Sequence, residues 1–291
     1  MAMRDRVAIV TDTASDITEE QAAEWDVRLV RLKVVFKDGA YTCGTEMTSE
    51  RFYERLLEDT EIPTTSQPSP AEFQEAFAAE LASGRDVVCL TISSKLSGTH
   101  QSACSARAMF TEEEQERIHI FDTQNLCISQ LLLVRVAVSM RDAGKTAQMI
   151  VETLERLAPR VRLVAMFDTL EYVAKGGRLP AGVAKAGKML NIKPVIGCEK
   201  GKIVMLGMAK GSKNGKNMIH KTLKKYGPAD HGRPFQFGYT GLSDAKLVKY
   251  LKDNEALYGT YSEDLPINLV GPSVGTHVGA GAIAFAYISQ S

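Results

Sequence analysis

Short apolar runs alternate with stretches of helical periodicity along most of the chain. Six runs are mostly apolar and bounded by polar or turn-forming residues, as buried strands are. They cover residues 6–12, 86–93, 118–123, 161–169, 234–240 and 266–271. Apolar residues three and four positions apart predict helices over 69–84, 125–144 and 146–159. This order predicts the α/β class, with mainly parallel sheets flanked by helices.

A domain boundary is expected near Pro159, where a long helical segment ends and a new strand begins at once. A chain of 291 residues can supply two cores of ordinary size. We therefore expect one α/β domain over residues 1–158 and a second over 159–291. A ligand at their interface is the default expectation for such a pair.

Composition narrows the class of protein without naming a function. Hydrophobic residues make up 44% and charged residues 24%, which excludes a disordered or fibrous chain. Lys plus Arg equals Asp plus Glu at 35 each, so no overall field favours nucleic acid. The longest apolar stretch, 131–140, is about half of what a membrane span needs. Five scattered cysteines without a C-x-x-C pair fit a reducing compartment, and we expect a cytoplasmic protein.

Aspartates follow the first predicted strand in the sequence TDTASD. Asp12 lies at the strand end, where open α/β sheets usually bind ligands. An aspartyl nucleophile for phosphoryl transfer would normally have a second acid two positions later, and that residue is Ala14. Ser15 and Asp16, with Glu19 three positions after Asp16, fit a helix cap. We favour capping over catalysis here.

Hydroxyl groups and backbone N–H groups gather in two other segments. Thr65 and Ser66 lie between prolines in residues 63–70, a turn that also suits the start of a helix. Residues 91–108 run from a strand end through Ser94, Ser97, Gly98 and Thr99 into a helix rich in small residues. Such a helix start can hold an anionic oxygen without a fixed cation. A tightly packed helix with a serine cap is the alternative.

Two later segments bring cations or histidine into glycine-rich surroundings. Arg178 follows paired glycines, whose conformational freedom would let it be aimed at a site. His277 and Gly275 lie in a segment with four glycines at 269–288. Ser97 with His277 could form a nucleophile and base, so an acyl hydrolase or transferase stays open as an alternative.

A basic stretch lies at residues 210–225. Its six lysines are Lys210, Lys213, Lys216, Lys221, Lys224 and Lys225. A solvated helix face is the usual reading, and docking of an acidic partner or transient contact with an anionic membrane surface is the sharper one. Residues 211–217 lack the spacing and the final Ser or Thr of a phosphate-binding Walker A loop. Nucleotide binding by that route is not expected.

These segments, taken together and in order, resemble the conserved blocks of the DegV family. The blocks read VTDTASD, PTTSQPSP, ISSKLSGTHQSA, DTLEYVAKGGRLP and VGPSVGTHVGAGAIAFAY, and they span nearly the whole chain. The resemblance implies a bacterial fatty-acid-binding protein of two α/β domains. It also implies a partner, a fatty acid kinase that makes acyl phosphate for phospholipid synthesis.

The resemblance further implies the residues of the site. Thr65, Ser97 and His277 correspond to the contacts of the fatty acid carboxylate, and Arg178 lies beside them. Residues expected nearby are Ser66, Ser94, Gly98, Thr99 and Gly275. The acyl tail would occupy an apolar channel. Such a protein is a carrier with no catalytic residue, metal or cofactor, and its ligand is a long-chain fatty acid.

Overall fold

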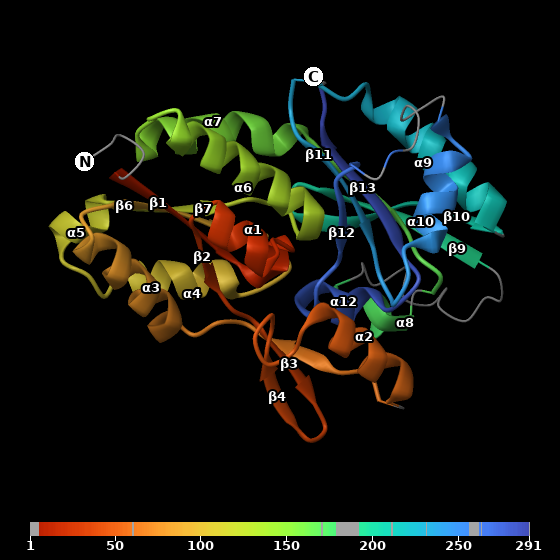
Figure 1. Ribbon diagram of the computed structural model, residues 1–291, viewed down its shortest axis with the longest axis horizontal. Coiled ribbons are helices and arrows are strands. Elements are labelled where there is room, and N and C mark those ends of the chain that lie inside the picture. The colour runs from red at the N-terminus through yellow and green to blue at the C-terminus, as the bar shows by residue number, and fades with distance from the viewer. Residues whose placement is uncertain are drawn as a thin grey trace.

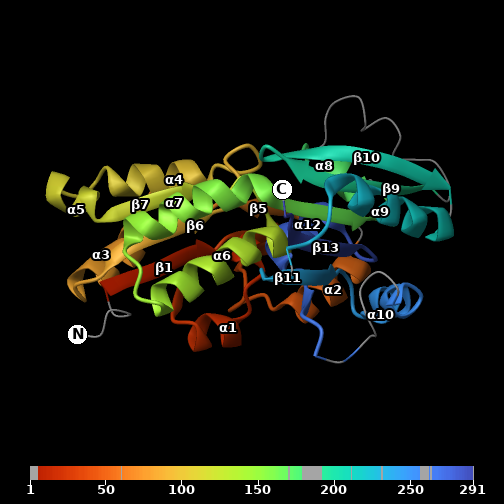
Figure 2. The same ribbon diagram turned by 90° about the horizontal axis from the view of Figure 1, so that it is seen from above.

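The computed structural model describes residues 6–59, 61–169, 171–178, 192–210, 212–230, 232–255, 262 and 264–290. A four-stranded and a six-stranded sheet lie end to end along the molecule (Figures 1 and 2). A small three-stranded sheet lies below the junction of the two large sheets in the view of Figure 1. The α/β class is therefore as the sequence predicts.

The four-stranded sheet is parallel throughout, with the order β2-β1-β6-β7. Its strands are β1 (Val7–Asp12), β2 (Val27–Val30), β6 (Asp86–Thr91) and β7 (Ile118–Asp122). Every residue of β1 is buried, which is typical of a parallel strand covered on both faces. One face packs on the helices α3 (Pro70–Ala82) and α4 (Thr99–Arg107). The other packs on the helices α6 (Cys127–Asp142) and α7 (Ala147–Leu157).

The six-stranded sheet has the order β10-β9-β8-β13-β11-β12. Its strands are β8 (Val161–Met166), β9 (Ile192–Glu199), β10 (Lys202–Lys210), β11 (Phe235–Tyr239), β12 (Ile267–Leu269) and β13 (Ile283–Ile288). Among the described strands of this sheet, only β11 and β12 pair in parallel. The expectation of mainly parallel strands is therefore wrong for this half.

Two local features explain the antiparallel pairing. Lys200 and Gly201 both have positive φ, 49° and 79°, as the two central residues of a tight hairpin turn do. They join β9 to β10 directly, so the two strands must run in opposite directions. The last strand, β13, then enters between β8 and β11 and is antiparallel to both. Neither β9 nor β10 stood out as an apolar run in the sequence.

The small sheet and the remaining helices complete the fold. The small sheet is antiparallel and contains β3 (Lys33–Phe36), β4 (Gly39–Thr42) and β5 (Thr64–Ser66). The other helices in the described parts of the chain are α1 (Glu19–Glu24), α2 (Ser49–Glu58), α5 (Glu112–Glu116), α8 (Glu171–Lys175), α9 (Ser212–Tyr226), α10 (Ala245–Lys252) and α12 (Pro272–Val278). None of the described helices is long and apolar enough to cross a membrane. Residues 181–190, where the sequence AGVAKAGKML predicts a helix, lie outside the described residues.

Each sheet is built from residues on one side of Pro159 only. The hydrophobic core, however, contains residues from both sides. The largest buried cluster combines Ile9 and Leu131 with Leu163 and Ala286. Helices α9 and α10 cover the other face of the six-stranded sheet. The division into domains at 1–158 and 159–291 stays a prediction, since a shared core does not test whether either half folds alone.

Candidate ligand-binding site

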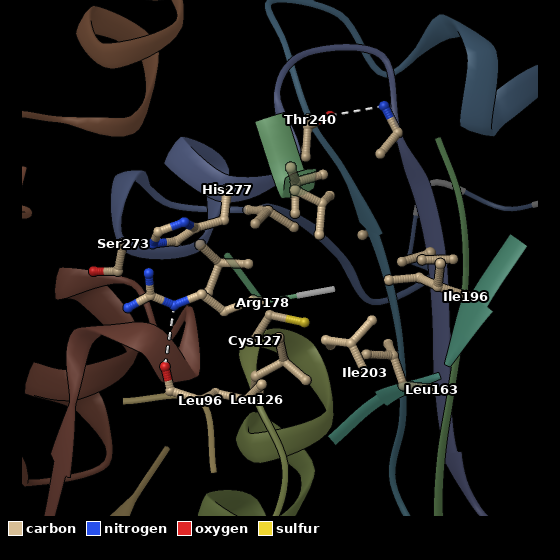
Figure 3. A pocket seen from close by; sticks show the side chains of 18 of the residues that line it. Leu96, Leu126, Cys127, Leu163, Arg178, Ile196, Ile203, Thr240, Ser273 and His277 are labelled. Carbon is tan, nitrogen blue, oxygen red and sulfur yellow. Dashed lines mark hydrogen bonds between the residues drawn. The ribbon is translucent and has the colours of Figure 1, made fainter. Parts of the chain in front are cut away.

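An apolar cavity lies where the two large sheets meet. Residues from before and after Pro159 line it. The empty space is about 890 Å³, including the part open to solvent. Leu126 and Cys127 come from the start of α6, while Leu163, Ile196 and Ile203 come from β8, β9 and β10. Figure 3 shows Leu163, Ile196 and Ile203 on the side of the cavity away from His277 and Arg178. The described residues include no cluster of three or more His, Cys, Asp or Glu that could hold a metal ion.

Polar side chains gather at one end of this cavity. Thr65 comes from β5, Ser97 from the loop before α4, Arg178 from the turn after α8, and His277 from α12. The four residues predicted around a carboxylate therefore line a single cavity. Whether they bind one stays a prediction. Figure 3 shows His277, Ser273 and Arg178 grouped on the side away from Ile196 and Ile203.

Thr65 and His277 form a hydrogen-bonded pair at the polar end. Thr65 Oγ1 lies 2.9 Å from His277 Nε2. Burial, with the nearby positive charge of Arg178, lowers the pKa of His277 from 6.5 to about 4. The imidazole is therefore neutral near pH 7, and the fixed positive charge at this end of the site comes from Arg178.

The surroundings of His277 determine its tautomer. Nδ1 is buried without a hydrogen-bond partner among the described residues. It faces Gly176 so closely that a Cβ at that position would fall 2.5 Å away. A proton on Nδ1 would point at this C–H surface without an acceptor, so the proton belongs on Nε2. Nε2–H then donates to Thr65 Oγ1, which leaves the Thr65 O–H free to donate to a ligand in the cavity.

Arg178 lies at the mouth with its guanidinium exposed to solvent. Its Nε donates to the carbonyl oxygen of Leu96 at 3.3 Å, and its Nη1 donates to the carbonyl oxygen of Gly176. These two carbonyls come from segments 82 and 2 residues away in the chain. Figure 3 shows the bond that joins Arg178 to Leu96. An exposed, already partnered guanidinium attracts an anion without enclosing it.

Ser97 combines a capping role with its place in the lining. Its Oγ accepts from the Thr99 backbone N–H at 3.3 Å and lies 2.9 Å from Thr99 Oγ1. His277 is hydrogen-bonded to Thr65 and not to Ser97. The described hydrogen bonds therefore do not assemble the nucleophile and base that the acyl hydrolase or transferase alternative requires.

The five residues expected nearby make other contacts and are outside the lining of the cavity. Ser94 donates to Asp122 through Oγ at 2.5 Å, and Ser66 is exposed. Gly98 begins α4, next to the buried Thr99. Gly275 lets α12 approach α2, since a Cβ there would lie 2.6 Å from the hydroxyl of Tyr53. Their roles in ligand binding stay predictions.

Ser273 lines the cavity and was not singled out from the sequence. It lies one helical turn before His277 in α12, and its Oγ is 3.0 Å from Thr13 Oγ1. The spacing of four residues within PSVGTH was the available signal, since residues four apart share a helix face. Thr240 and Tyr239, at the end of β11, also contribute to the lining and were missed.

Asp12, at the end of β1, and Asp16, shortly after it, make structural contacts, but Asp16 does not cap α1 as expected. Thr18 and Gln21 form the capping box of α1, so the expected cap by Ser15 and Asp16 is wrong. Asp12 accepts from the backbone N–H groups of Ala14 and Ile92 at 3.0 and 2.7 Å. Burial raises the pKa of Asp12 from 3.8 to about 6. The Asp16 side chain turns away from α1 toward the segment before α12.

The basic stretch lies on the face of the six-stranded sheet opposite the cavity. Helix α9 packs there through Ile219 and Leu223, while Lys221, Lys224 and Lys225 are exposed. The side chains of Lys213 and Lys216 lie outside the described residues. The described lysines therefore do not contribute to the cavity, and docking to a partner or membrane stays a prediction.

Fold and cavity together define an α/β protein with an apolar internal cavity that is polar at one end. The family model described as "Uncharacterised protein, DegV family" matches residues 6–290. The chain belongs to the DegV family, as the sequence motifs indicated.

Relatives and solved structures share nearly the full length of the chain. A DegV domain-containing protein of Caldanaerobacter subterraneus subsp. tengcongensis is 32% identical over 280 residues, covering 96% of this chain and 97% of the relative. A DegV family protein from Thermus thermophilus, whose structure concerns fatty acid binding, is 29% identical, with TM-score 0.84 and coverage of 98% and 100%. A stearic acid-binding protein from Eubacterium ventriosum is 26% identical, with TM-score 0.87 and 98% of each chain covered.

Proposed function

We propose that this protein binds one long-chain fatty acid in the cavity, with the carboxylate at the polar end and the tail along the apolar lining. The observation that carries the proposal is the asymmetry of the cavity. Among the lining residues, Thr65 contacts His277, and Arg178 bonds to the carbonyl of Leu96 next to Ser97. His277 and Arg178 lie on the side away from Leu163, Ile196 and Ile203 (Figure 3). A single-headed amphiphile matches this distribution. The fatty-acid-binding proteins of similar fold support the choice of ligand.

The two ends of the cavity make different contributions to binding. Each buried methylene contributes roughly 0.8 kcal/mol, so a tail of about sixteen carbons supplies most of the affinity. Hydrogen bonds from Thr65 and Ser97 contribute about 1 to 2 kcal/mol each and mainly fix the orientation. Neutral donors and one exposed guanidinium leave the carboxylate accessible.

An accessible carboxylate suits a carrier that hands its ligand to another enzyme. We propose that the protein presents the bound acid, in the cytoplasm, to a fatty acid kinase that makes acyl phosphate for phospholipid synthesis. The exposed lysines of α9 are the candidate surface for docking that kinase or for brief contact with an anionic membrane. In this role the protein itself would catalyse no reaction.

Native mass spectrometry of the purified protein tests the ligand. We expect a mass increase equal to one long-chain fatty acid, lost on delipidation and restored by palmitate. Delipidated, folded protein that binds no palmitate in calorimetry would overturn the proposal. Steady release of p-nitrophenol from p-nitrophenyl palmitate, abolished by Ser97→Ala, would replace the carrier with an acyl hydrolase.

The kinase step has a separate test. Purified fatty acid kinase, ATP and palmitate should give acyl phosphate only when the protein is present. Charge reversal at Lys221, Lys224 and Lys225 should then reduce the rate while leaving palmitate binding unchanged. Equal rates of acyl phosphate formation with the parent protein and the charge-reversal variant would exclude α9 as the docking surface. The assignment of the ligand would not be affected.

A further inference from the structure

Asp16 connects the N-terminal segment to the helix that carries His277. It is buried, between β1 and α1, in the left-handed backbone region at φ 56°. Its Oδ1 accepts from the backbone N–H of Gly271 at 3.0 Å, across 255 residues of sequence. Its backbone oxygen accepts from Asn268 Nδ2 at 2.9 Å. One residue thus holds two points of the segment that leads into α12.

Gly271 is the N-cap residue of α12, and Gly271 itself has no side chain to cap the helix. The carboxyl group of Asp16 therefore binds the backbone where the helix begins. Helix α12 spans only Pro272–Val278 and carries both Ser273 and His277 into the cavity lining. In so short a helix, a shift at the start moves every side chain that follows.

The environment of Asp16 makes this contact costly. Its Oδ2 is buried without a hydrogen-bond partner among the described residues. The titratable groups whose charges act on Asp16, or on which it acts, are Asp12, Tyr53 and Cys127, and none of them is a cation. Desolvation raises the pKa of Asp16 well above its ordinary value. Burying a carboxyl group without an ion-pair partner costs free energy, and the bond from the buried Gly271 N–H is the compensation that the structure shows.

We propose that Asp16 is a positioning residue, which fixes the start of α12 so that Ser273 and His277 face the polar end of the cavity. Other contacts also hold this segment: Tyr53 Oη donates to the Val270 carbonyl at 2.8 Å, the Val270 N–H donates to the Tyr239 carbonyl at 2.9 Å, and Thr13 Oγ1 lies 3.0 Å from Ser273 Oγ. Asp16 differs from these because it accepts from the backbone N–H of the N-cap residue. The inference rests on the proposed function only where ligand affinity is the readout.

Asp16→Gly is the sharpest variant, because glycine keeps the left-handed backbone and removes the side chain with its carboxyl group. Asp16→Asn is the rescue variant, since its amide oxygen can still accept from Gly271 and asparagine tolerates this backbone region. Thr18→Ala is the matched control: it removes the cap of α1 on the same segment without touching α12. Gly271→Pro removes the donor at φ −73°, an angle proline adopts.

Two readouts separate positioning from general destabilisation. The first is ligand-free: the NMR signals of the His277 ring and the hydrogen exchange of the α12 amides. The second is the dissociation constant of palmitate. For Asp16→Gly we expect shifted His277 signals, faster exchange in α12 and palmitate binding weakened about tenfold or more. Asp16→Asn should stay within about threefold of the parent protein, and Thr18→Ala should leave the His277 signals unchanged.

Each outcome supports or overturns the positioning role of Asp16. Unchanged His277 signals and unchanged exchange in folded Asp16→Gly would overturn the inference, as would shifts of the same size in Thr18→Ala. If Asp16→Gly does not fold, Gly271→Pro replaces it, and unchanged His277 signals there have the same meaning. If the parent protein binds no palmitate, the proposed function fails while the ligand-free measurements still decide the role of Asp16.

Discussion

Thr65 Oγ1 and His277 Nε2 lie 2.9 Å apart, although 212 residues separate them in the chain. The pair joins the edge strand β5 to helix α12 at the polar end of the cavity. Because Nε2–H donates to the threonine, the hydroxyl proton of Thr65 is left to donate into the cavity. His277 thus orients Thr65, which under the proposed function is the donor to the carboxylate.

Thr65→Val removes this hydroxyl at nearly constant volume. We expect palmitate to bind about tenfold more weakly, as the loss of one hydrogen bond to a charged group implies. Calorimetry measures the change. Thr64→Val is the matched control, because Thr64 is exposed and lies outside the cavity lining. Equal affinities for Thr65→Val and the parent protein would contradict the assigned contact.

Ser97→Ala should weaken palmitate binding by about 1 to 2 kcal/mol for the same reason. It should also lower the free energy of unfolding by about 1 kcal/mol, because Ser97 Oγ accepts from the Thr99 N–H at the start of α4. Ser94→Ala separates the two effects, since Ser94 bonds to Asp122 outside the cavity. An unchanged dissociation constant for Ser97→Ala would leave the serine with its capping role alone.

Gly176→Ala tests the packing behind His277. The new Cβ would lie 2.5 Å from Nδ1, which is too close for any contact, so the ring must move. We expect the bond to Thr65 to break and the pKa of His277 to rise from about 4 toward 6.5, as NMR titration can measure. Gly39→Ala is the control, because its Cβ would meet Tyr41 at 3.9 Å. An unaltered titration of His277 would show that the ring has another position available.

The pKa of His277 also predicts a pH dependence of stability. The folded value is about 4 and the ordinary value 6.5, so the unfolded chain binds the proton more tightly between them. The stability that depends on neutral His277 is complete above pH 6.5 and is lost as the pH falls toward 4. The loss amounts to roughly 3 kcal/mol at 1.36 kcal/mol per unit.

His277→Gln isolates this effect from Asp12. The pKa of Asp12 is raised to about 6, so its contribution to stability changes with pH in the opposite direction. Urea unfolding of both proteins from pH 4 to 7 gives the difference due to His277 alone. Parallel curves for the parent and His277→Gln would show that the ring is not held neutral.

The sequence predicted the fold class because its strongest patterns were correct. All six predicted strands form, and the predicted helices at 69–84, 125–144 and 146–159 are α3, α6 and α7. Strands β2 and β13, the hairpin of β9 and β10, and the small sheet were missed. Their direction and pairing depend on the positive φ angles of Lys200 and Gly201 and on partners distant in sequence, which hydrophobic periodicity does not encode.

In the site too, features set by neighbouring residues could be predicted, and contacts between residues distant in sequence could not. The start of α4 at Thr99 follows from a local motif, and local reasoning made Ser97 a reasonable candidate. The pairing of Thr65 with His277 depends on β5 and α12 meeting across the molecule, so only the family resemblance indicated it. Ser273 shows what both approaches missed, because its contact with Thr13 is formed only by the folded chain.

The apolar end of the cavity should determine which tail lengths bind. Ala165 lines the cavity from β8 and pairs with Ile196 of β9, which lies away from His277 (Figure 3). Ala165→Leu should fill this end and weaken palmitate binding about tenfold or more, as added bulk in a packed site costs roughly 1 to 3 kcal/mol. Laurate, with a shorter tail, should lose less. Competition between the two acids measures the ratio.

Val164→Ile is the control for Ala165→Leu, because successive residues of a strand point to opposite faces. Val164 belongs to the cluster under α9 and α10, so added bulk there strains the fold without entering the cavity. We expect its ratio of palmitate to laurate affinity to equal that of the parent protein. A ratio altered equally by both variants would mean that chain length is set by the fold as a whole. A ratio altered by Ala165→Leu alone places the end of the tail beside β8 and β9.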